Sequence, residues 1–95
     1  MADQHIQEQI SLSVLVRDRN GILYEGPAKA LSSINEKGPF DVLSLHQNFI
    51  SLIIKEIVIH DLDGQSREIP APGGVLMVRE NRVEVYIGIL HGLKV

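Results

Sequence analysis

Apolar and polar residues alternate along much of this chain with the two-residue period of a β-strand. The pattern is clearest from Ile10 to Arg17 and from Arg82 to Ile89, where every second residue is valine, isoleucine or leucine. Successive side chains of a strand point to opposite faces, so this period is typical of a strand with one buried face. We therefore predict a strand in each stretch, with the apolar set facing a core.

Turn signals divide the rest of the chain into further short strands. Asn20-Gly21 is typical of a type I′ hairpin turn, and Asp63-Gly64 is a second hairpin signal. We expect Gly26-Pro27 to end the second strand and Leu31, in the third, to point inward. The further predicted strands are residues 22–24, 29–34, 40–43, 57–60, 67–69 and 75–78.

The stretch from Leu43 to Ile59 is ambiguous, because its apolar residues also fit the stripe of an amphipathic helix. It is rich in isoleucine, however, and β-branched side chains lose rotamer freedom in a helix. The run at its end also leads directly into the Asp63-Gly64 turn. We interpret the stretch as two strands joined near Lys55-Glu56.

Many short strands separated by turns predict an all-β fold, and we expect a single-domain, antiparallel two-sheet β-sandwich. A chain of 95 residues has room for one core only. The expected organisation is a flexible N-terminal segment (1–9), the sandwich domain (10–90) and a C-terminal tail (91–95). Prolines at the ends of segments, Pro27, Pro39 and Pro70, would protect exposed sheet edges from pairing with other chains.

Composition excludes several classes of function. The chain has no cysteine, which removes disulfides, thiolate nucleophiles and cysteine-zinc sites. A net charge of −3 with scattered lysine and arginine argues against a nucleic-acid partner. No apolar run approaches the ~20 residues that span a bilayer, and the polar N-terminus does not read as a secretory signal, so a cytoplasmic location is expected.

His46 stands in a distinctive loop, and Asp41, Ser44 and Ser51 are close to it in sequence. These residue types could supply a nucleophile and a base, but the sequence has no G-x-S-x-G elbow to support a catalytic site. His46 either ties its loop by hydrogen bonds or lies at a contact surface, and we favour the contact role.

Other polar residues match no template of a catalytic or metal site. His60, Asp61 and Asp63 have no metal-ligand spacing and fall on a hairpin. Gly73-Gly74 precedes a strand rather than a helix, so it is interpreted as a turn and not as a phosphate loop. No cofactor and no metal are expected.

Three motifs in order and spacing resemble a known family. They are Tyr24-Glu25-Gly26, the stretch from Gly38 to His46, and the pair of strands formed by residues 73–78 and 83–85. Together they resemble the N-terminal β-sandwich domain of the epsilon subunit of F-type ATP synthases, called delta in mitochondria. The similarity covers residues 10–89.

The chain departs from the family pattern in the segment around His46. Asp41 stands where glycine is usual, Ser44 where proline is usual, and Gln47-Asn48-Phe49 where alanine-proline-leucine is common. Pro39 takes a position often held by an acidic residue that faces the membrane ring. The family's C-terminal helical hairpin would follow residues 90–95, where the sequence ends, and both a naturally short relative and a chain cut at the domain boundary fit this. The inhibitory and nucleotide-sensing behaviour that the hairpin carries is not assigned here.

The resemblance implies a non-catalytic central-stalk subunit of a rotary ATP synthase, peripheral to the inner face of the membrane. Its partners would be the gamma subunit and the c-ring. Glu36, Lys37, Phe40 and His46 would meet the ring, and a partly exposed apolar set from Val75 to Val78 is one candidate for the gamma contact. The alternatives are a stand-alone β-sandwich adaptor with a different partner and, more distantly, an enzyme that depends on His46.

Overall fold

The computed structural model describes residues 11–45 and 47–88, which form strands and turns and contain no helix. The strands are β1 (Leu12–Asp18), β2 (Gly21–Ala28), β3 (Ala30–Asn35), β4 (Gly38–Leu43), β5 (Phe49–Leu52), β6 (Glu56–His60), β7 (Ser66–Pro70), β8 (Val75–Arg79) and β9 (Arg82–Tyr86). The expected terminal segments, 1–9 and 91–95, lie outside the described residues. The predicted all-β class is confirmed.

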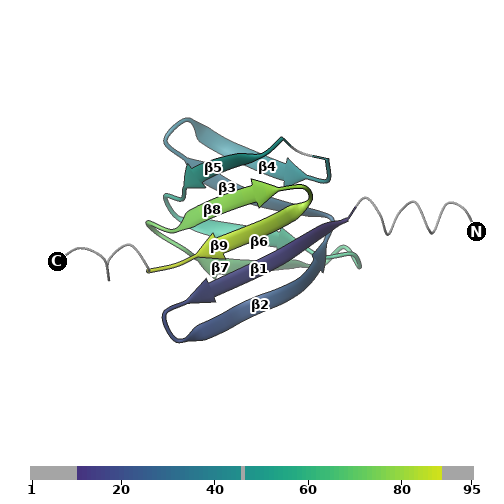
Figure 1. Cartoon of the computed structure of the whole chain (residues 1–95), viewed down its shortest axis with the longest axis horizontal. Helices are drawn as coiled ribbons and strands as arrows, with labels where there is room; N and C mark the ends of the chain where they lie inside the picture. Colours follow the sequence, from purple (N-terminus) through teal and green to yellow (C-terminus); the bar gives the residue numbers. More distant parts are fainter. Residues whose placement is uncertain (1–10, 46, 89–95) are drawn as a thin grey trace, which may run out of the picture.

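The strands form two sheets that pack face to face, as Figure 1 shows. One sheet has five strands in the order β2-β1-β9-β8-β5, and the other has four in the order β4-β3-β6-β7. The predicted sandwich is therefore confirmed, with one departure from purely antiparallel pairing. β1 and β9 run parallel, with Val14 beside Val83 and Val16 beside Val85. Both strands place buried valines in the middle of the sheet, and this pattern would fit a parallel or an antiparallel neighbour equally well.

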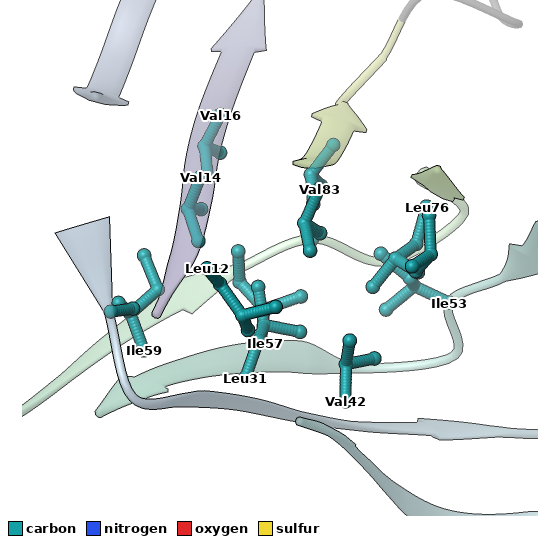
Figure 2. Packing of buried hydrophobic residues seen from close by; sticks show 14 residues of the cluster. Leu12, Val14, Val16, Leu31, Val42, Ile53, Ile57, Ile59, Leu76 and Val83 are labelled. Carbon is teal, nitrogen blue, oxygen red and sulfur yellow. The ribbon is translucent and has the colours of Figure 1, made fainter. Parts of the chain in front are cut away.

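The core lies between the sheets and is built from branched aliphatic side chains, which Figure 2 shows meeting from both layers. Leu12, Val14 and Val16 alternate into it from β1, and the predicted inward residue Leu31 is fully buried. Burial of one such side chain contributes about 1.5–3 kcal/mol. Ser33 is the single buried polar residue in the described part of the chain, and its hydroxyl donates to the Glu56 carbonyl at 2.9 Å.

The β1–β2 turn lies at its predicted position but is not of the predicted type. The β1–β2 hairpin forms, yet Asn20 has no positive φ, so its turn is not type I′. Instead the Asp18 carboxylate accepts hydrogen bonds from the backbone N–H groups of Asn20 and Gly21, at 2.8 and 3.1 Å. The conformation with two successive positive φ angles occurs in the β8–β9 turn, at Glu80 (50°) and Asn81 (66°).

Two further predictions concern strand limits. The expected end of the second strand at Gly26-Pro27 is wrong, because β2 continues to Ala28. β2 is an edge strand, where a proline need not donate to a ladder. The strand interpretation of residues 43–59 is confirmed by β5 and β6, which are joined through residues 53–55.

Candidate functional site

The loop between β4 and β5, which contains His46 and which we call the histidine loop, is held against the β8–β9 turn. The Leu45 N–H donates to Oδ1 of Asn81, and the Glu80 N–H donates to Oδ1 of Asn48 at 3.1 Å. Leu45 has a φ of 64° and its side chain is 79% exposed. His46 itself lies outside the described residues, but the positions on both sides of it are anchored. Leu45 and Asn48 therefore lie at the end of the sandwich that carries the β8–β9 turn.

Glu36 and Lys37 lie at the opposite end of β4 from this loop. They form the exposed tip of the β3–β4 turn, in which the Lys37 N–H donates to Oδ1 of Asn35 at 2.9 Å. β4 has six residues, and five steps of about 3.3 Å separate its ends by roughly 17 Å. The structure thus does not bring Glu36 and Lys37 to the end of the sandwich that carries the histidine loop.

Phe40 lies in the middle of β4 and is half-buried. Its ring meets that of Phe49 on β5 edge to face, with centroids 5.8 Å apart and an interplanar angle of 79°. This geometry is favourable for an aromatic pair, and it joins the edge strands of the two sheets. Part of the Phe40 ring is therefore engaged within the protein and only the rest can face a partner.

An apolar surface covers the outer side of β5 and β8, and we call it the β5–β8 face. Ile50 and Leu52 are 71% and 60% exposed, and they pair with Met77 and Val75 on β8. These four residues define the face. The predicted apolar set from Val75 to Val78 is divided by the strand period, since Val75 and Met77 lie on this outer side while Leu76 and Val78 are in the core.

A row of polar side chains crosses the outer side of the other sheet. The Ser32 hydroxyl donates to the Asp41 carboxylate at 2.6 Å and contacts Nε2 of His60 at 2.9 Å, and Nδ1 of His60 lies 3.1 Å from the Ser66 hydroxyl. The row links β4, β3, β6 and β7. A serine–histidine–aspartate triad needs the carboxylate on the imidazole, whereas here it holds a serine. The row therefore ties four strands together and does not form that triad.

Of the candidate metal residues, His60 belongs to the polar row, whereas Asp61 and Asp63 are part of the β6–β7 turn. Oδ1 of Asp61 accepts hydrogen bonds from the backbone N–H groups of Asp63 and Gln65, each at 3.0 Å. In the part of the chain that the structure describes, no three histidine or acidic side chains gather as a metal site would require. Gly73 has a φ of 75°, and a Cβ on Gly74 would lie 3.1 Å from two backbone oxygens, which fits a tight turn.

Sequence reasoning missed the anchors of the histidine loop and the exposure of β5. Asn81 and Leu45 are 36 positions apart, so no local pattern indicates their hydrogen bond. Ile50 and Leu52 share one face of β5, but Phe49 on the other face is apolar as well, so the sequence does not show which face is covered. Within residues 11–45 and 47–88, no helix has the length and apolar character needed to cross a bilayer.

Comparison with known proteins shows the fold. No protein-family model matches the chain, and no curated protein matches it. A chain in the structure of the Euglena gracilis mitochondrial ATP synthase (OSCP/F1/c-ring, rotational state 1) is similar with a TM-score of 0.76 and 14% identity, over 82% of this chain and 51% of that one. A chain in the central stalk/c-ring structure of the Tetrahymena thermophila mitochondrial ATP synthase is similar with a TM-score of 0.64 and 12% identity, over 80% of this chain and 62% of that one. This chain thus spans between half and two thirds of those chains.

Proposed function

We propose that the protein is a non-catalytic central-stalk subunit of a rotary F-type ATP synthase, which contacts the gamma subunit and the c-ring. The observation that carries the proposal is the sandwich fold, shared over most of this chain with chains of two rotary ATP synthases. The epsilon-like motifs of the sequence support it independently. In this role the protein would be peripheral to the cytoplasmic side of the membrane and would help torque pass between ion flow and ATP chemistry on other subunits.

A rigid sandwich suits such a role physically. Two packed sheets resist bending, and their loops present a fixed surface to a partner. The hydrogen bonds that anchor the histidine loop to Glu80 and Asn81 add to this rigidity. The proposed task is therefore an interface function that needs no reacting group.

The proposed ring contact runs along β4. Glu36 and Lys37 would engage the ring at one end of the strand, the His46 loop at the other, and Phe40 would contribute from the middle. A contact about 17 Å long is needed to include both ends. For gamma, the proposed contact is the β5–β8 face, because an exposed apolar patch on a soluble domain marks a protein contact.

Cross-linking tests the ring contact, and the absence of native cysteine makes single-cysteine variants unambiguous. In the assembled ATP synthase we expect Leu45→Cys and Lys37→Cys both to cross-link to the c-ring. Glu25→Cys is the matched control, because Glu25 is exposed on β2, at the far edge of the five-stranded sheet from β5. If only Glu25→Cys cross-linked to the c-ring, the proposed orientation, with β4 toward the ring, would be rejected.

Co-purification tests the partner. The chain should co-elute with the gamma subunit of its own species, and Ile50→Asp should prevent this by placing a charge on the β5–β8 face. Leu62→Asp is the control, since Leu62 is 52% exposed in the β6–β7 turn, away from that face. A stable monomer that binds neither gamma nor the c-ring would favour the adaptor alternative instead.

A further inference from the structure

β5 differs from the other strands that form the edges of the two sheets. The sheet orders make β2 and β5 the edges of one sheet and β4 and β7 the edges of the other. The strands β2, β4 and β7 each contain a proline and at least one charged residue, whereas β5 reads Phe-Ile-Ser-Leu. Proline and charge are the usual means of keeping an edge from pairing with another chain. Among the described edge strands, β5 alone lacks both.

The backbone of β5 has hydrogen-bonding groups that point to its free side. Ile53, just after the strand, donates to the Gly74 carbonyl and accepts from the Gly73 N–H, both at 2.8 Å, so its groups face β8. The next residue, Ile54, donates in the other direction, to Ile34 at 2.9 Å. Backbone groups of a strand alternate in this way. The N–H and C=O groups of Ile50 and Leu52 therefore point away from β8. One lone pair of the Leu52 carbonyl already accepts from the Ser51 hydroxyl at 3.0 Å, and the other is open to a further donor.

A groove of about 890 Å³ runs beside this edge. Residues 49–54 form one wall, and the β3–β4 turn at residues 35–37 forms the other. The Asn35 side-chain amide donates to the Ser51 hydroxyl at 2.9 Å, which holds the turn next to β5. Glu36 and Lys37 bring opposite charges to that wall, and the β5 wall has no charge up to Ile54. The groove therefore suits an uncharged, apolar occupant.

We propose that β5 accepts an extended segment of a partner polypeptide as an added strand beside Ile50 and Leu52. The segment would have apolar side chains at alternate positions, next to those of Ile50 and Leu52, and its backbone would bond to their outward groups. Such a strand extends the five-stranded sheet and occupies the groove. The inference goes beyond the proposed function and holds whether or not the partner belongs to a rotor.

A second copy of the chain is a weaker fit to the same edge. Two β5 strands would meet over four residues each, far from the roughly 20–30 residues a side of a specific interface. A partner strand can instead be one part of a larger contact that also covers the β5–β8 face.

The test uses a defined probe and the isolated ¹⁵N-labelled chain. The probe is a capped peptide of alternating valine and threonine with one lysine at each end. We expect it to shift the Ile50 and Leu52 amide signals and to slow their exchange with solvent. The same peptide with N-methyl groups on the valines cannot form the ladder, and it should bind at least roughly tenfold more weakly.

Substitutions at Leu52 separate strand addition from simple apolar contact. Leu52→Pro keeps an apolar side chain but removes an N–H that points away from β8, so it should abolish probe binding while the dispersed NMR spectrum persists. Leu52→Val is the matched control and should bind like the native chain. Equal binding of the native and N-methylated probes, no binding of either, or concentration-dependent self-association through β5 would each overturn the proposal.

Discussion

Asn81 connects the histidine loop to the rest of the sandwich, and its substitution tests how that loop is held. Its backbone has a φ of 66°, its Oδ1 accepts from the Leu45 N–H, and its carbonyl accepts from the Ser13 N–H at 2.8 Å. A substitution leaves the carbonyl in place. The side-chain acceptor, the cost of the left-handed conformation and the conformational entropy of the unfolded chain can change, and three variants separate these contributions.

Asn81→Asp keeps an acceptor oxygen and tolerates positive φ, so the free energy of unfolding should change by less than about 0.5 kcal/mol. Asn81→Gly loses the hydrogen bond, at about 1 kcal/mol, and gains unfolded-state entropy of about 0.5–1 kcal/mol, for a total loss of roughly 1.5–2 kcal/mol. Asn81→Ala loses the same bond and replaces asparagine, which tolerates the left-handed region, by alanine, which does not, for a total loss of roughly 2–3 kcal/mol.

Urea denaturation followed by circular dichroism measures these differences in the free energy of unfolding. In thermal denaturation, each kcal/mol lost should lower Tm by about 4–8 °C in a domain of this size. In the glycine variant the Leu45 amide should also exchange faster with solvent, because its acceptor is gone. The reasoning is refuted if the aspartate variant is as unstable as the glycine variant. It is equally refuted if the Leu45 amide is unchanged in the glycine variant.

Two further predictions concern the core and the outer side of β9. Leu31→Ala should lower the free energy of unfolding by about 2–5 kcal/mol in urea denaturation, whereas Leu43→Ala, at a 55% exposed position on the neighbouring strand, should stay within about 0.5 kcal/mol. The hydrogen bond from the Tyr86 hydroxyl to the Glu84 carboxylate, followed by burial and the carboxylate's charge, raises the pKa of Tyr86 above 10.0. The unfolded chain therefore loses this proton at a lower pH than the folded chain does. The free energy of unfolding should fall as pH rises from 10.0 through the raised pKa of the folded state. Glu84→Gln should lower the pKa of Tyr86 in an absorbance titration.

Local patterns in the sequence determined the strands and the composition of the core. Alternation placed Leu31 inward, and the β-branched run after Leu43 indicated strands where a helical stripe also fitted. Both are confirmed because side-chain direction and rotamer freedom are properties of the residue and its immediate neighbours. The turn positions were also predictable, since glycine and asparagine mark them, although Asn20 shows that the turn type depends on a nearby side chain.

Only the tertiary structure decided which distant segments meet. The parallel pairing of β1 with β9 joins residues about seventy positions apart, such as Ser13 and Arg82, and no alternation pattern distinguishes a parallel neighbour from an antiparallel one. The Asn81 bond to the histidine loop and the free edge of β5 are likewise consequences of strand order. The sequence states which face of a strand is apolar, whereas the assembled sheets decide whether that face or edge has a neighbour, because covering it requires chain from elsewhere.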